Sequence, residues 1–298
     1  MINGETSSAF SEKRAEWLDW ISGNDQNTIH KQLWQLLSDY AFFLTLNDLR
    51  RKADQNLVEG VGFNRQLLYL LDSGFVAKQA MGIRCLVDKR KDVFSLGRLV
   101  EDLKLNRALI TRESYLACRD LPYDFVSAKK LLSDGLISSG QFTAYQGIDP
   151  KPDDSERMHK NFDEMSGVLP ESRKRSDCVS LEWLERLDSK IKHCENVKLF
   201  ATKFIAHPAD TSSRAALTNE QAGITLNRIE ECLKSLCYVA DSVSSQLLQS
   251  DSVGGVPTPQ TFDVVENLDK GWIAAELLEE VRDLWNQHCD AVKQWTNG

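Results

Sequence analysis

The chain has 298 residues, 42% of them hydrophobic, which is enough to fill a packed core and excludes a disordered chain as the default. It carries 36 basic and 44 acidic residues, for a net charge of −8, which excludes a protein that coats nucleic acid through a broad basic face but leaves room for a local basic groove. Its seven cysteines form no CxxC pair, so we expect reduced thiols in a cytoplasmic protein.

No targeting or membrane-spanning segment is expected. The N-terminal stretch lacks an apolar core between a basic start and a small-residue cleavage site, unlike a secretory signal. No apolar run in the sequence approaches the roughly 18 to 20 residues that a membrane-spanning helix needs. We therefore expect a soluble protein without membrane contact.

Apolar residues recur at three- and four-residue spacing through most of the chain, and alternating β-branched runs are hard to find. This pattern predicts an all-α protein, an irregular helical bundle. The expected helices cover about 10–22, 28–56, 62–91, 95–108, 111–119, 125–133, 180–207, 217–249 and 270–296.

We expect an N-terminal extension (1–27), a helical bundle (28–250) and a C-terminal helix (251–298) packed on that bundle through Trp272, Trp285 and Trp295. Residues 145–178 contain three prolines and many charges, which predicts a long loop near the middle of the chain. We interpret the basic run at 172–177 within it as solvated surface rather than as an arm that contacts RNA.

The helix predicted over 180–207 can begin at Ser180, whose hydroxyl can cap the first backbone amides. At 100° per residue, its apolar residues collect on one face. These residues are Leu184, Leu187, Ile191, Cys194, Ala201 and Ile205. Asn196, Lys203 and His207 fall in one row on a different side, and Pro208 should end the helix.

His207 has two interpretations. A histidine in the last turn can simply bond the final carbonyl groups and meet the negative end of the helix dipole. Alternatively, the row that it shares with Asn196 and Lys203 has no obvious packing purpose and suits a polar site.

Arg84 and Asp88 lie four residues apart, so we expect an ion pair on one face of the helix at 62–91. They are either an interhelical strut or part of the lining of the His207 site. His30, His159 and His288 have no recognisable partner, and we expect surface or packing roles for them.

Several chemistries find no support in the motifs. His193, Cys194 and His207 lack the paired spacing and the fourth ligand of a zinc site. No phosphate-binding glycine loop and no dinucleotide fingerprint occurs, so we expect no metal and no cofactor.

Three segments, in order, resemble the abortive-infection U-type (Abi U) branch of the HEPN superfamily. They are "RQLLYLLDSGFVAKQAMGIRCLVDKRKDVFSLGRLVEDL" (65–103), "CENVKLFATKFIAHPAD" (194–210) and "NRIEECLKSLCYVADSVSSQLL" (227–248). The resemblance implies an α-helical bundle, usually a homodimer, whose active members serve in phage defence and cut RNA without a metal ion. The implied chemistry is attack of a ribose 2′-hydroxyl on the neighbouring phosphate, with a histidine to move the proton and an arginine to stabilise the charge.

The chain departs from this family at the arginine. In the family, four to six residues separate the arginine from the histidine, and the corresponding positions in this chain are Thr202, Ala201 and Phe200. None of the three is basic. Lys203 is the nearest cation along the helix, and Arg84 could replace the missing arginine from another helix.

Two functions therefore stay open. One is a defence-type ribonuclease with His207 as general acid and base, Lys203 and Arg84 as phosphate cations, and Asn196 as an orienting group. The other is a HEPN module without cleavage, acting as a dimeric scaffold or as a binder of RNA, a nucleotide, a cognate antitoxin or another partner protein.

Overall fold

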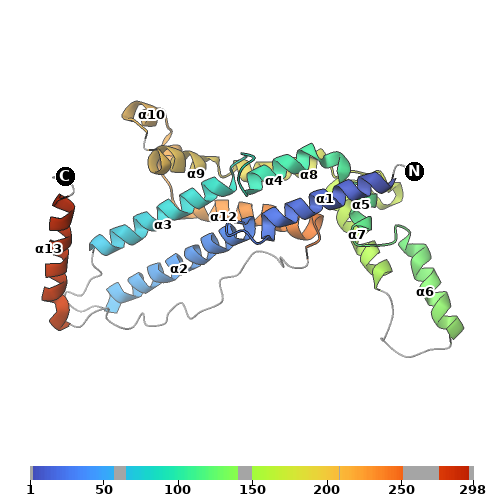
Figure 1. Ribbon diagram of the computed structural model, residues 1–298, viewed down its shortest axis with the longest axis horizontal. Coiled ribbons are helices and arrows are strands. Elements are labelled where there is room, and N and C mark those ends of the chain that lie inside the picture. Colours follow the sequence, from blue (N-terminus) through green and yellow to red (C-terminus); the bar gives the residue numbers. More distant parts are fainter. Residues whose placement is uncertain (1–2, 57–64, 140–149, 208, 251–274, 295–298) are drawn as a thin grey trace. The chain divides into compact units, whose positions relative to one another are not determined.

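Figure 1 shows a computed structural model of the chain, which describes residues 3–56, 65–139, 150–207, 209–250 and 275–294. These residues are almost entirely helical, and their one isolated β-bridge joins Thr111 to Cys178. The all-α prediction is confirmed. The chain divides into two compact units, Met1–Pro259 and Gln260–Gly298.

The first unit contains twelve α-helices among its described residues: α1 Asn3–Ser22, α2 Ile29–Asn56, α3 Arg65–Leu86, α4 Leu96–Leu105, α5 Arg112–Ala117, α6 Phe125–Ser139, α7 Lys151–Ser166, α8 Leu181–Lys192, α9 Glu195–Phe200, α10 Thr211–Ala215, α11 Asn219–Ala222 and α12 Leu226–Asp241. Shorter segments are the 3-10 turns η1 Arg107–Leu109 and η2 Pro170–Ser172, and the π-helical turns η3 Ala201–Ala206 and η4 Ser242–Leu247. The second unit contributes η5 Ala275–Leu277 and α13 Leu278–Gln294.

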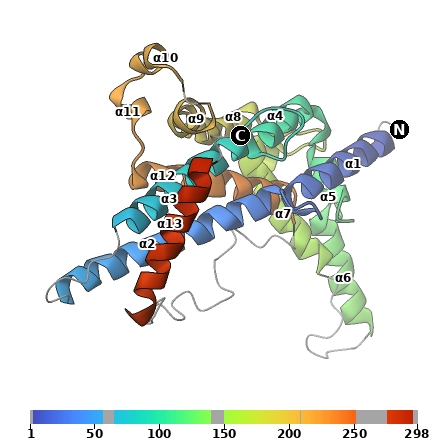
Figure 2. The same ribbon diagram turned by 60° about the vertical axis from the view of Figure 1, so that its left-hand side comes forward.

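The core forms where amphipathic helices cross. Helix α8 packs against both α4 and α12, while α3 packs against α2, α9 and η3 (Figure 2). Helices α4, α8 and α12 each begin directly after a capping residue. The side-chain oxygens of Ser95, Ser180 and Thr225 accept a backbone amide of the first turn.

The segment expected to be an N-terminal extension contributes α1 to this core. Phe10 and Trp17 are fully buried, and the Trp17 Nε1 donates a hydrogen bond to an Asp102 carboxylate oxygen in α4 at 2.7 Å. The packing of α13 on the bundle stays a prediction, and Trp272 and Trp295 lie outside the described residues.

The loop predicted over 145–178 is wrong for its central part, because residues Lys151–Ser166 form α7. Pro152 stands in the first turn, where a missing amide hydrogen costs nothing, and Gly167 ends the helix with a left-handed φ of 72°. Met158, Phe162 and Met165 are buried at four- and three-residue spacing along its inner face.

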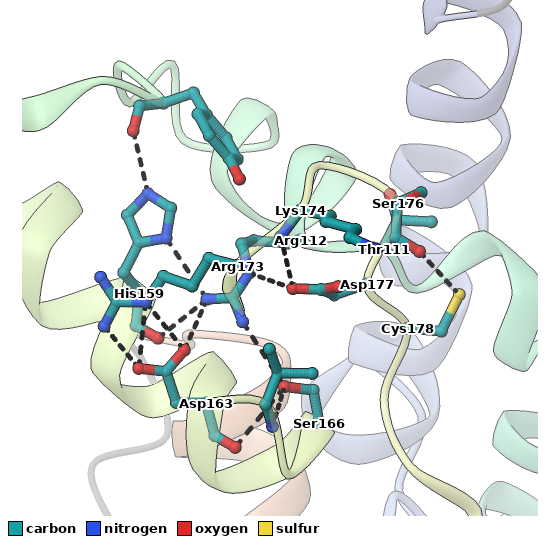
Figure 3. A network of polar contacts seen from close by, with 12 residues as sticks. Thr111, Arg112, His159, Asp163, Ser166, Arg173, Lys174, Ser176, Asp177 and Cys178 are labelled. Carbon is teal, nitrogen blue, oxygen red and sulfur yellow. Dashed lines mark hydrogen bonds and ion pairs between the residues drawn. The ribbon is translucent and has the colours of Figure 1, made fainter. Parts of the chain in front are cut away.

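A buried arginine joins α7 to the rest of the bundle (Figure 3). Arg112, at the start of α5, is 0% exposed and forms ion pairs with Asp163 of α7 at 2.8 Å and with Asp177 at 3.1 Å. Its Nη1 also lies 3.3 Å from Nδ1 of His159 and 3.2 Å from the His159 carbonyl oxygen. Two carboxylates therefore compensate this charge inside the protein.

The basic run after α7 belongs to the same network. Arg173 is partly buried and donates from Nε to both oxygens of Asp163, at 3.0 and 3.1 Å. Arg175 pairs with Glu113 at 2.9 Å and lies over the Tyr123 ring. Arg173 is thus folded back onto the protein, whereas Lys174 and Arg175 are exposed as expected, Arg175 while still paired.

Removing Arg112 should destabilise the fold strongly. Arg112→Ala leaves Asp177 without its cation and Asp163 with Arg173 alone, and breaking such a buried pair costs about 3–5 kcal/mol. Arg157→Ala, which removes an exposed α7 arginine paired only with Asp154, should cost no more than about 1 kcal/mol. Urea unfolding of both variants checks this, and equal losses would contradict the assignment.

His159 should make stability depend on pH. Its burial lowers its pKa, the hydrogen bond to the Tyr123 carbonyl opposes this, and the Arg112 charge lowers the pKa further. Because the unfolded chain then binds the proton more readily, the free energy of unfolding should decrease as the pH falls below about 6.5 and regain its full value above it.

The matched variant is His159→Gln, which cannot take up a proton. Unfolding curves between about pH 5 and 8 should show a shallower pH dependence for this variant than for the parent chain. Parallel pH profiles would mean that His159 titrates normally in the folded protein.

Candidate functional site

The predicted helix over 180–207 is broken into three pieces. Ser180 caps α8 as expected, with its hydroxyl accepting from the Trp183 amide at 3.1 Å. A turn at His193 and Cys194 then separates α8 from α9, and the chain changes to π-helix at Ala201. The predicted apolar face is confirmed, since five of its six members are buried and Ile205 is partly buried.

The π-helical turn displaces the predicted polar row. Its hydrogen bonds skip one residue more than those of an α-helix, as in the 3.2 Å bond from the His207 amide to the Thr202 carbonyl. Asn196 precedes this change, so its alignment with Lys203 and His207 on a continuous α-helix does not hold. Among the described residues, no hydrogen bond joins Asn196 to either of them.

His207 lies just beyond the last helical residue, Ala206. Its backbone is not helical, with φ −139° and ψ 83°, and its side chain is exposed. Pro208 lies outside the described residues, so its predicted role in ending the helix stays a prediction. An exposed imidazole at this position can reach a ligand in solution.

Arg84 joins this segment from α3. Its Nε donates a hydrogen bond to Oγ1 of Thr202 at 3.1 Å, and that hydroxyl donates to the Lys198 carbonyl at 2.8 Å. The Arg84 guanidinium is thus bonded at position 202, and four residues separate Thr202 from His207.

The expected Arg84–Asp88 ion pair is wrong, because α3 ends at Leu86 and the four-residue helical spacing does not reach Asp88. Asp88 instead pairs with Arg90 at 2.9 Å. Burial acts to raise the pKa of Asp88, but hydrogen bonds from Arg90 outweigh it, with a smaller contribution from the charge of Arg84, and the pKa is lowered.

Lys203 is held by the segment that follows His207. Its Nζ lies 2.8 Å from Oγ of Ser213, in the short helix α10. Asp210 caps α10 by accepting the Ser213 amide at 2.7 Å, and this bond lowers the pKa of its carboxyl group. Arg214, one residue further, lies with its guanidinium carbon 6.0 Å from the Phe204 ring centre.

Of the predicted site residues, Arg84 is bonded to the Thr202 side chain, Lys203 follows Thr202 in the chain, and the His207 amide bonds to the Thr202 carbonyl, whereas Asn196 is left out. Among the described residues, no hydrogen bond or ion pair joins the side chains of Arg84, Lys203 and His207 to one another. The structure adds Thr202, Ser213 and Arg214, which sequence reasoning missed. The sequence alone marks Thr202 only as one of the positions at which the resembling family has its arginine and this chain has no cation. Ser213 and Arg214 follow Pro208 in a stretch without a helical pattern that could have drawn attention to them.

The electrostatic character of the cluster is positive. In the part of the chain that the structure describes, none of Arg84, Lys203 and Arg214 forms an ion pair with a carboxylate. Their direct contacts are two hydroxyl groups and an aromatic ring, and the charges of Asp210 and Asp88 offset them only from beyond ion-pair distance. Arg84 and Lys203 are partly exposed and Arg214 is exposed.

Other chemistries have less support from the geometry. Within the described ranges, no group of three or more His, Cys, Asp or Glu side chains is placed to hold a metal ion. Cys194 and Cys232 are buried together between α9 and α12, with the Cys194 thiol 3.8 Å from the Cys232 carbonyl oxygen. His193 lies 3.7 Å from Glu231 on the exposed side of that turn.

The helices in the described part of the chain are too short or too polar to cross a bilayer. Comparison with known proteins found no matching family model, no matching curated protein and no matching solved structure.

Proposed function

We propose that the chain is a HEPN-like, defence-type ribonuclease that cuts RNA without a metal ion. His207 acts as the general acid and base, and Arg84 and Lys203 stabilise the charge on the phosphate. The observation that supports this function is the hydrogen bond from Arg84 to Thr202. Thr202 occupies the first of the positions at which the resembling family has its arginine.

Arg84 has the geometry that a phosphate ligand requires. Its contact with Thr202 uses Nε, and among the described residues its two Nη atoms have no hydrogen-bond partner. Those atoms can bind two oxygens of one phosphate at once, which the point charge of Lys203 cannot do. Thr202, itself anchored to the Lys198 carbonyl, fixes the direction of the guanidinium.

The proposed reaction is a transesterification. His207 takes the proton of a ribose 2′-hydroxyl while the 2′-oxygen forms a bond to the adjacent phosphorus. The bond from phosphorus to the 5′-oxygen of the next nucleotide breaks, and that oxygen takes up a proton. The products are a 2′,3′-cyclic phosphate and a 5′-hydroxyl. A histidine suits both transfers because the imidazole changes protonation near neutral pH.

The test is cleavage of a mixed, end-labelled RNA in excess EDTA by the full chain and by His207→Ala. We expect the parent chain to yield cyclic-phosphate ends and His207→Ala to lose about 10²–10⁴-fold in rate. Arg84→Met should also lose activity, whereas Arg157→Ala should retain it. Cleavage by His207→Ala at the parental rate, with both proteins folded by circular dichroism, would refute the assignment.

A second function, association without cleavage, is favoured by a different observation. The first half of α3 exposes Tyr69 and Leu70, at 69% and 65%, and a Cβ added to Gly74 would meet nothing within 4 Å. Leu70 and Gly74, four residues apart, share one side of α3, and Tyr69 lies about a quarter-turn round the helix from Leu70. Near the other end of α3, Arg84 contacts η3. Among the described residues, the exposed surface at the start of α3 therefore adjoins a part of the same helix that is packed against other elements.

We propose a second copy of the chain as the occupant of this surface, in keeping with the homodimer that the resemblance implies. Two α2–α3 pairs that meet through α3 would form a four-helix arrangement and bury Tyr69 and Leu70. In this function the Arg84–Thr202 bond is an interhelical strut and His207 has no chemical task.

Leu70→Glu should weaken such a dimer because it places a charge in an apolar interface. Leu131→Glu makes the same change at a leucine on α6 that is 73% exposed, and it should leave association unchanged. Sedimentation velocity over a range of protein concentrations separates the two. A parent chain that stays monomeric, or equal effects of both variants, would exclude this surface.

A further inference from the structure

The segment after His207 suggests a ligand larger than one phosphate. We infer that α10 forms the second wall of a phosphate-binding track along η3, to which Arg84 contributes at Thr202 and Lys203 and Arg214 contribute from η3 and α10. The ligand class is a nucleic-acid strand that presents at least two successive phosphates. This inference rests on the proposed function, and it adds Arg214 as a residue that binds substrate.

Three contacts hold α10 against η3. The amide of Ala209 donates to the Lys203 carbonyl at 2.8 Å, the Lys203 ammonium meets the Ser213 hydroxyl at 2.8 Å, and Arg214 lies over the Phe204 ring. Figures 1 and 2 both show α10 turned outward next to α9. The chain therefore folds back after His207 and places a second arginine near Lys203.

The partners of these cations distinguish them from the many described lysines and arginines that pair with carboxylates, although Arg14, Arg98 and Arg107 also bond to oxygens that carry no charge. Lys89 and Lys104 both pair with Asp188, and Lys129 pairs with Asp153 and Glu156. Such pairs leave little net charge for a ligand. Around η3 the direct partners are hydroxyls and a ring, and Asp210 and Asp88 act on these cations without forming ion pairs with them, so the segment keeps an excess of positive charge on a protein whose net charge is −8.

The carboxylate of Asp210 is the acidic group within this segment. Its Oδ1 accepts from the Ser213 amide at 2.7 Å and from the Ser212 hydroxyl at 2.8 Å. The carboxylate therefore caps α10 and forms no ion pair with Lys203 or Arg214, although the charges of both cations contribute to lowering its pKa. Its role in the track is to hold α10 in place.

Cations that come from three elements favour a strand over a mononucleotide. Arg84 approaches from α3, whereas Lys203 and Arg214 come from η3 and α10, so the positive charge is spread along the segment rather than focused on one point. A strand can neutralise these charges with successive phosphates and release counterions from each. An isolated phosphate can satisfy only part of the cluster.

The test measures binding of a fluorescent oligodeoxynucleotide, which lacks the 2′-hydroxyl and cannot be cleaved by the proposed chemistry. For each phosphate contact, the slope of log binding constant against log salt concentration changes by about 0.7 for a single strand. We expect Arg214→Ala to reduce that slope by about 0.7, and Arg84→Met to do the same. Arg157→Ala removes an equal charge from α7 and should leave the slope unchanged.

The outcomes separate this inference from the proposed function. Binding that depends on Arg214 supports the track even if His207→Ala shows that no RNA is cut. Cleavage that depends on His207, together with an unchanged slope for Arg214→Ala, would overturn the track and leave the ribonuclease standing. An equal reduction of the slope by the milder Arg214→Gln would show that the lost charge, and not misfolding of α10, is the reason for a reduced slope in Arg214→Ala.

Discussion

The buried charge of Arg112 is the constraint on which this end of the bundle depends. A guanidinium without solvent is tolerated only where carboxylates and acceptors surround it, and here Asp163, Asp177 and the His159 carbonyl do so. These partners come from α7 and from the basic run that follows it. One side chain at the start of α5 thereby fixes the position of a segment whose composition resembles a loop.

The cations around η3, Arg84, Lys203 and Arg214, differ from Arg112 because no carboxylate forms an ion pair with them among the described residues. Arg84 and Lys203 are held by hydroxyl oxygens, which orient a cation without neutralising it. Arg112 is neutralised and sealed from water, so it can stabilise but cannot bind a ligand. The same residue type thus serves structure at one place and favours anion binding at another, and the difference lies in the partners and in exposure.

Sequence reasoning reached the features that local physics determines. The Ser180 cap and the buried face from Leu184 to Ala201 follow from hydroxyl chemistry and helical spacing. Sequence reasoning failed where a residue far away in the sequence determines whether a side chain is buried or bonded. Helix α7 carries many charges, and only Arg112, far away in the sequence, shows why Asp163 belongs inside. The hydrogen bond between Arg84 and Thr202 likewise joins residues that no periodicity connects.

The change from α- to π-helix at Ala201 links these points. An uninterrupted α-helix would align Lys203 and His207 on one face of the helix. In the π-helical turn, Lys203 contacts α10 while His207 lies beyond the helical residues, its amide bonded to the Thr202 carbonyl. The extra residue in the turn therefore changes the geometry between Thr202, which holds Arg84, and the imidazole. Such turns occur frequently at functional sites. The other π-helical turn among the described residues, η4, lies in the core with Val243 and Leu247 buried, so such a turn serves packing as well. What distinguishes η3 is that it ends at an exposed histidine and carries a lysine bonded to a hydroxyl group.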